Sequence, residues 1–105
     1  MCGKFRNWEP INKFYPGCEV FINDSSIDMI KDALNIKSTL KINYSNFIVQ
    51  EFPWSDHENK YDIFIGWWNL NYLKDEEIDS YLLGIRTCLK TNGFAILCES
   101  TSDIL

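Results

Sequence analysis

The chain has 105 residues, of which 46% are hydrophobic and 15% aromatic, and its net charge is −5. This length allows one small domain with a single modest core, and the composition is too apolar for an intrinsically disordered segment. The acidic balance and the absence of a basic cluster argue against nucleic acid as a partner, because its binding depends on cations that neutralise phosphates. An acidic protein can instead attract a basic peptide.

No membrane partner is expected from the sequence, since no apolar run approaches the roughly 20 residues that a membrane helix requires. The first residues do not resemble a signal peptide, because Lys4 and Arg6 lead into polar residues. These features predict an intracellular protein, cytoplasmic or nuclear.

The cysteines Cys2, Cys18, Cys88 and Cys98 form no C-x-x-C pair, and the one histidine, His57, is far from each of them in sequence. A zinc site requires closely spaced ligands. The pattern therefore predicts reduced thiols, with one or two in the core, and no metal. His57 lies in a polar loop and is expected to be exposed.

The predicted elements begin with a weak helix over residues 7–15, in which apolar side chains recur every three residues. Pro10 requires that helix to start at or near it. After Pro16-Gly17 breaks the chain, the short apolar run 18–22 predicts a strand.

A second helix is predicted from Ile27 to Leu34, because apolar residues fall at i, i+3 and i+7. Either Ser25 or Ser26 can cap its start. Asn35 can close it in the left-handed conformation.

The next predicted elements are two strands separated by a loop. β-Branched and aromatic residues between Ser38 and Gln50 predict one strand, placed late in that stretch. A polar loop over 52–60 follows. The run from Tyr61 to Trp68 has almost no polar residue, which is typical of a strand buried on both faces.

The clearest predicted helix runs from Asp75, a good N-cap, to Lys90. Its inner stripe is expected to contain Ile78, Tyr81, Leu82, Ile85 and Leu89. Asn92-Gly93 is expected to stop it before a strand over 94–97. Helices that alternate with apolar strands predict an α/β fold with a mostly parallel sheet.

Asp24 follows the first predicted strand, at the sheet edge where open α/β folds bind ligands. A carboxylate there can accept two hydrogen bonds from a ribose diol. Asp24 also opens the pattern D-x-S-x-x-M-I-x-x-A, which Ser26, Met29, Ile30 and Ala33 complete. This pattern resembles the second strand and helix of class I S-adenosylmethionine-dependent methyltransferases.

Two further segments follow in that family's order. YDIFI, residues 61–65, looks like the start of the family's fourth strand, and LKTNGF, residues 89–94, looks like the "LKPGG" turn before the fifth. More narrowly, YDIFIGWWNLNYLKDEEI is similar to the corresponding region of the protein N-terminal methyltransferases, which methylate the α-amino group of X-Pro-Lys/Arg termini. IVQEF, residues 48–52, is similar to that family's "LQDF" segment, in which an apolar residue and the Gln contact adenine.

The resemblance implies S-adenosylmethionine as cofactor and a basic protein N-terminus as methyl acceptor. The implied cofactor site contains Asp24, Ser26, Val49, Gln50 and Trp67. The implied substrate site contains Trp68, Tyr72 and Ser100, where Tyr72 and Ser100 replace the family's histidine and asparagine. No residue is assigned a catalytic role.

The resemblance spans nearly the whole chain, 1–105, as a single partial methyltransferase-like domain that matches the middle of a longer protein. The family's first strand, glycine-rich loop and C-terminal strands have no counterpart, so we expect a partial Rossmann-like sheet that is split into two strand pairs. Such a truncated domain is expected to be weakly active or inactive alone.

Two other functions fit the sequence. One is a non-catalytic protein-interaction subunit that retains the α/β scaffold and forms homo- or hetero-oligomers through exposed sheet edges. The other is an unrelated nucleotide-binding module that prefers ATP or NAD. Affinity for S-adenosylhomocysteine would favour the methyltransferase-like hypothesis over both of these alternatives.

Overall fold

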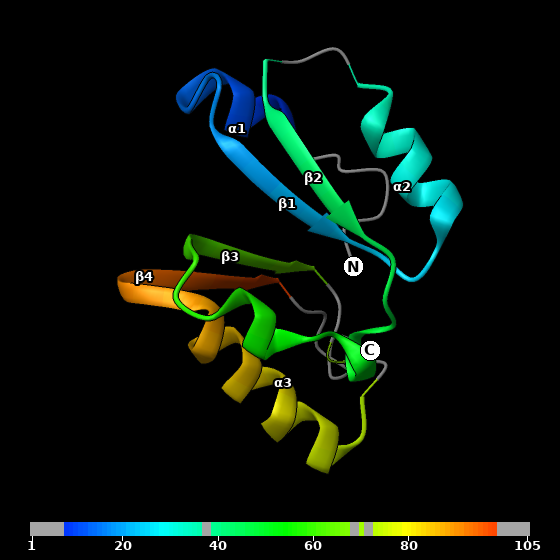
Figure 1. Ribbon diagram of the computed structural model, residues 1–105, viewed down its shortest axis with the longest axis vertical. Coiled ribbons are helices and arrows are strands. Elements are labelled where there is room, and N and C mark those ends of the chain that lie inside the picture. The colour runs from blue at the N-terminus through cyan, green and yellow to red at the C-terminus, as the bar shows by residue number, and fades with distance from the viewer. Residues whose placement is uncertain (1–7, 37–38, 68–69, 71–72, 99–105) are drawn as a thin grey trace, which may run out of the picture. The chain divides into compact units, whose positions relative to one another are not determined.

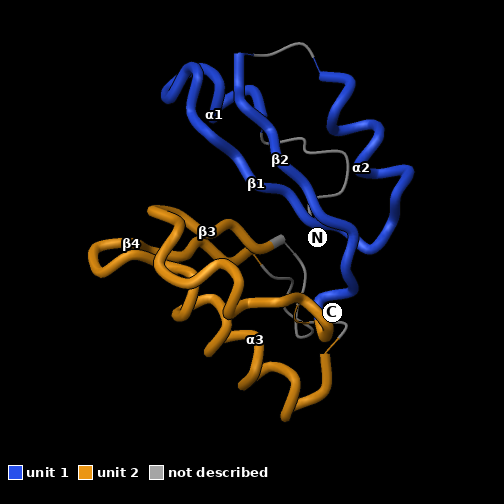
Figure 2. Tube along the Cα trace, viewed as in Figure 1, with its two compact units in different colours: residues 1–49 blue, residues 50–105 orange. Residues whose placement is uncertain are grey.

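The computed structural model describes residues 8–36, 39–67, 70 and 73–98. The chain folds as two compact units, residues 1–49 and 50–105 (Figure 2). In each unit a helix connects two parallel strands (Figure 1). A search of the described helices finds none with the length and apolar character that crossing a bilayer requires.

The first unit contains α1 (Trp8–Phe14), β1 (Glu19–Asn23), α2 (Ile27–Leu34) and β2 (Lys41–Ser45). The two strands are parallel and pair from Glu19↔Lys41 to Asn23↔Ser45. Parallel neighbours cannot be joined by a tight turn, because the chain must return along the length of the sheet. Here α2 makes that return, in agreement with the predicted order of a strand, a helix and a second strand.

Local signals define α2 well. Ser26 is the N-cap, with an extended backbone (φ −94°, ψ 115°), and its Oγ accepts a hydrogen bond from Met29 N at 3.4 Å. The inward face of the helix presents Ile30 and Ala33, which are fully buried and form the core of this unit together with Ile22 of β1. The predicted bounds of this helix are confirmed.

Three details of the first unit differ from prediction. β1 begins and ends one residue later than the predicted 18–22. β2 ends at Ser45 opposite the last residue of β1, so the strand is not late in its stretch, and Val49 begins the short 3₁₀ helix η1 (Val49–Glu51) instead. Asn35 is right-handed (φ −85°), because its N–H still donates to Asp32 O at 3.2 Å as the helix closes.

The second unit contains η2 (Trp54–His57), β3 (Tyr61–Trp67), α3 (Asp75–Cys88) and β4 (Leu89–Cys98). β3 and β4 are parallel, with an irregularity between Tyr61 and Ile63 and regular pairing from Ile63↔Phe94 onward. The described strands thus form two separate two-stranded sheets. The predicted α/β class, parallel pairing and split into strand pairs are confirmed.

The termini of α3 correct the prediction. Lys74, not Asp75, is the N-cap, and its backbone N–H donates to Glu77 Oε1 at 2.9 Å. The helix ends before Leu89, whose backbone is extended (φ −83°, ψ 142°) and pairs with Tyr61. Asn92-Gly93 therefore lies inside β4 and does not stop the helix.

The buried face of α3 also differs from the predicted stripe. Tyr81 and Ile85 are buried as expected, whereas Leu82 is 43% exposed. Gly84 and Cys88 take part in the buried face instead. Gly84 allows this packing, because a Cβ at that position would overlap the indole ring of Trp54 in η2.

β3 is not buried on both faces. On one face, Phe64 contacts Trp54 and Tyr81, with ring centroids 6.1 and 6.0 Å away. The opposite face, which we call the open face, contains Ile63 (37% exposed), Ile65 (39%), Phe94 (54%) and Ile96 (50%). In the described part of the second unit, η2 and α3 both pack toward Phe64, which explains why the opposite face is exposed.

Gly84→Ala should lower the free energy of unfolding of the second unit by about 1–3 kcal/mol, the usual cost of overpacking. Alanine normally stabilises a helix relative to glycine by about 1 kcal/mol, so the sign of the change tests the contact with Trp54. Chemical denaturation followed by circular dichroism measures it. The control, Ser80→Ala on the exposed side of α3, should be close to neutral, and an unchanged or stabilised Gly84→Ala would contradict the packing.

Candidate functional site

Asp24 lies directly after β1, at the carboxyl edge of the first sheet. Among the residues that the structure describes, Asp24 is the one buried acidic residue, with 4% of its surface exposed. Its Oδ1 accepts a hydrogen bond from Ser26 N at 2.9 Å. This bond closes the turn from strand to helix, and Ser26 in turn caps α2. Asp24 therefore has a structural role in the turn, and this role fixes its carboxylate at the edge where such sheets bind ligands.

Two asparagines that the sequence analysis did not single out lie at the same edge. Asn46 Nδ2 donates to Asp24 O at 2.8 Å. Asn23 accepts from Ser45 Oγ at 2.7 Å and from Phe47 N at 3.0 Å, and donates to Phe47 O at 3.0 Å. We call Asn23, Asp24, Ser45 and Asn46 the edge cluster. The sequence signal is a polar residue at the end of each of two neighbouring parallel strands.

The other residues of the predicted cofactor site follow later in the chain. Val49 is half-buried at the start of η1, three residues beyond Asn46. Gln50 is exposed and Trp67 ends β3, and both belong to the second unit. The structure therefore brings Asp24 and Ser26 together. The predicted substrate residues Trp68, Tyr72 and Ser100 lie outside the described residues.

His57 is not the exposed bystander that its polar loop suggests. It is half-buried, and its Nδ1 lies 2.6 Å from the Tyr61 hydroxyl. Its ring centroid is 4.9 Å from that of Phe52 and 5.8 Å from that of Tyr61. The loop is less polar than expected, because its Trp54 packs against Phe64 of β3 and Tyr81 of α3. His57 is half-buried because it packs against the neighbouring ring of Phe52.

The environment of this pair shifts both pKa values. Burial lowers the pKa of His57 below its ordinary 6.5, Lys60 lowers it further, and Asp56 opposes the shift. Burial raises the pKa of Tyr61 to about 12, with a smaller contribution from Cys88. At neutral pH the pair is therefore an uncharged imidazole beside a protonated phenol, and the phenol donates when the ring carries its proton on Nε2.

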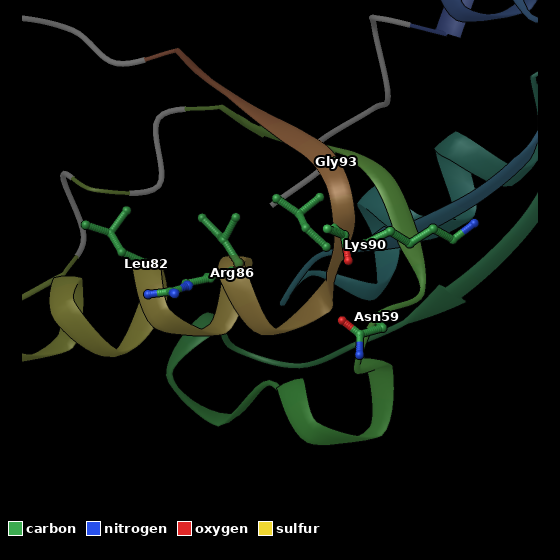
Figure 3. A pocket seen from close by; sticks show the side chains of 8 residues that line it. Asn59, Leu82, Arg86, Lys90 and Gly93 are labelled. Carbon is green, nitrogen blue, oxygen red and sulfur yellow. The ribbon is translucent and has the colours of Figure 1, made fainter.

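A hollow of about 350 Å³ lies elsewhere in the second unit, lined by Asn59, Leu82, Ile85, Arg86, Leu89, Lys90, Thr91 and Gly93 (Figure 3). Arg86 extends along α3 toward Leu82, and Lys90 extends the opposite way. Lys90 Nζ lies 3.5 Å from Asp62 Oδ1. Because the two cations diverge, they do not form a common anion site, and no predicted site residue lines this hollow.

No metal centre is formed by the residues that the structure describes, which contain no group of three or more metal-ligating side chains. Cys18, Cys88 and Cys98 are free thiols, and Cys88 is buried. Cys88 thus lies in the core, as expected for one or two of the cysteines.

The stability of the second unit should decrease as the pH falls below about 6.5. The unfolded chain keeps the ordinary pKa of His57, whereas the folded pKa is lower. The unfolded state therefore binds more protons than the folded state as the pH falls below 6.5. Stability is lost in that interval, and His57 causes no loss above it. Thermal melts between pH 7.5 and 5.5 measure the effect, with His57→Gln as the control. An equal slope in both proteins would show that His57 is not responsible.

In comparisons with protein-family models, curated proteins and solved structures, nothing matches this chain.

Proposed function

We propose that the chain is an S-adenosylmethionine-binding, methyltransferase-like domain of Rossmann type. The observation that carries this proposal is the placement of Asp24. A buried carboxylate lies at the carboxyl edge of a parallel strand–helix–strand unit, directly before a capped helix. That arrangement suits recognition of a ribose diol, because the acid is held in place before any ligand arrives.

The pattern around Asp24 is consistent with this cofactor. Ser26 and Ile30, two members of the motif that resembles the methyltransferases, serve as N-cap and core residue of α2. Val49, which the resemblance assigns to the adenine contact, follows β2 at the same edge of the sheet as Asp24. The roles that the resemblance assigns to Gln50 and Trp67, which belong to the second unit, remain predictions.

Methyl transfer by the chain alone is expected to be weak or absent. Tyr72 and Ser100 stand where the resembling family has a histidine and an asparagine. Transfer from a sulfonium depends mainly on aligning a neutral amine with the methyl group, so both residues would act by positioning. A basic protein N-terminus is the acceptor to try first, and the acidic net charge of −5 favours its approach.

Asp24→Asn should weaken binding of S-adenosylhomocysteine roughly 10- to 100-fold, as expected when a hydrogen bond to a charged group is lost. Asparagine keeps an oxygen that can accept from Ser26 N, so the turn should remain intact. Titration calorimetry at a temperature where both proteins are folded measures the affinity. The control Asp28→Asn removes an equal charge from an exposed position on α2 and should bind as the wild type does.

Parallel titrations with ATP and NAD extend this experiment to the other nucleotide ligands. A preference for either over S-adenosylhomocysteine would favour an unrelated nucleotide-binding module. A folded wild type that binds none of the three would end the cofactor proposal.

A second candidate is a non-catalytic interaction subunit, and the open face favours it. Parallel sheets are normally covered on both faces, yet Ile63, Ile65, Phe94 and Ile96 are 37–54% exposed. This candidate predicts a stable oligomer without cofactor affinity.

Light scattering measures the mass in solution against the 12.4 kDa of one chain. If the open face carries an interface, Ile65→Lys should lower that mass, because a buried lysine without a partner is costly. The matched control Leu83→Lys changes an apolar side chain that is 64% exposed on α3 and should leave it unaltered. A wild type that is monomeric at all concentrations would remove this candidate.

A further inference from the structure

Asn23 makes hydrogen bonds that a neighbouring strand would otherwise make. β2 ends at Ser45, so the backbone of Phe47 lies beyond the ladder with β1. The side-chain amide of Asn23 pairs with both polar groups of Phe47, accepting from its N–H and donating to its C=O, each at 3.0 Å. An amide offers this donor and acceptor side by side, which no carboxylate or hydroxyl does. The third bond, from Ser45 Oγ at 2.7 Å, orients the amide.

The neighbouring residue strengthens the same connection. Asn46 Nδ2 donates to the main-chain oxygen of Asp24 at 2.8 Å. Consecutive residues at the end of β1, Asn23 and Asp24, are thus bonded to consecutive residues after β2, Asn46 and Phe47. The position of residues 46–49 is therefore specified relative to Asp24 and not merely by the end of a strand.

We infer that Asn23 is a positioning residue that holds residues 46–49 beside Asp24, so that it sets cofactor affinity without touching the cofactor. The inference rests on the proposed function for its ligand. Ile48, 46% exposed, and the half-buried Val49 directly follow the bonded residues. A segment that is ordered in advance loses less conformational entropy on binding, and the ligand gains that difference as affinity.

Two variants separate the bonds. Asn23→Ala removes all three side-chain bonds, whereas Asn23→Asp keeps the acceptor for Ser45 and for Phe47 N but loses the donor to Phe47 O. The matched control is Asn43→Asp, which adds the same charge at an exposed position of β2.

Hydrogen exchange of individual backbone amides tests the inference without any cofactor. The Phe47 amide should exchange at least tenfold faster in Asn23→Ala and by a smaller factor in Asn23→Asp, which keeps the acceptor for Phe47 N but sets a carboxylate oxygen against Phe47 O. The control should leave this amide unchanged. An unaltered Phe47 rate in Asn23→Ala would overturn the inference.

Calorimetric titration with S-adenosylhomocysteine, well below the melting temperature of every variant, tests the consequence. Affinity should fall about tenfold or more in Asn23→Ala, by less in Asn23→Asp, and not in Asn43→Asp. Faster exchange at Phe47 with unchanged affinity would make Asn23 a purely structural residue and overturn its positioning role. If the wild type itself does not bind, the proposed function fails together with the effect on affinity, while the exchange rates still decide whether Asn23 holds the segment.

Discussion

Both units depend on the same constraint, the helical return between two parallel strands. The return starts at the carboxyl end of one strand and delivers the chain to the beginning of the next. In the first unit it succeeds because α2 buries Ile30 and Ala33 against Ile22 of β1. The turn into that helix must form at the carboxyl edge of the sheet, and Asp24 is there because its Oδ1 closes the turn. The geometry of the candidate site is thus a consequence of how the crossover begins.

The elements that could be predicted from the sequence are those with local signals. The bounds of α2 follow from the serine cap and from the spacing of Ile30 and its neighbours, which act within a few residues. The sequence predicts β2 too late, because the β-branched residues Ile48 and Val49 favour a strand. The pairing partner decides instead, since β1 ends at Asn23 and the ladder ends opposite it at Ser45. The β-propensity of a residue carries no information about where the partner strand ends.

The candidate site shows the same limit. Asp24 could be found from a motif of adjacent residues, whereas the edge cluster joins strand ends that are about twenty residues apart in sequence and requires the register to be known. The polarity of residues 52–60 alone predicts that His57 lies in an exposed loop. The packing of Phe52 and Trp54 determines its burial, and that packing depends on the absence of a side chain at Gly84.

The division of buried side chains between the units bears on cooperativity. Ile22, Ile30 and Ala33 form a core from the first unit alone, and Tyr81, Ile85 and Cys88 are buried in the second. Each half of the chain therefore has its own set of contacts to lose on opening, and the free energy that protects an amide can differ between the halves. The free energy of opening is therefore best measured for each unit separately, from the exchange of its own amides.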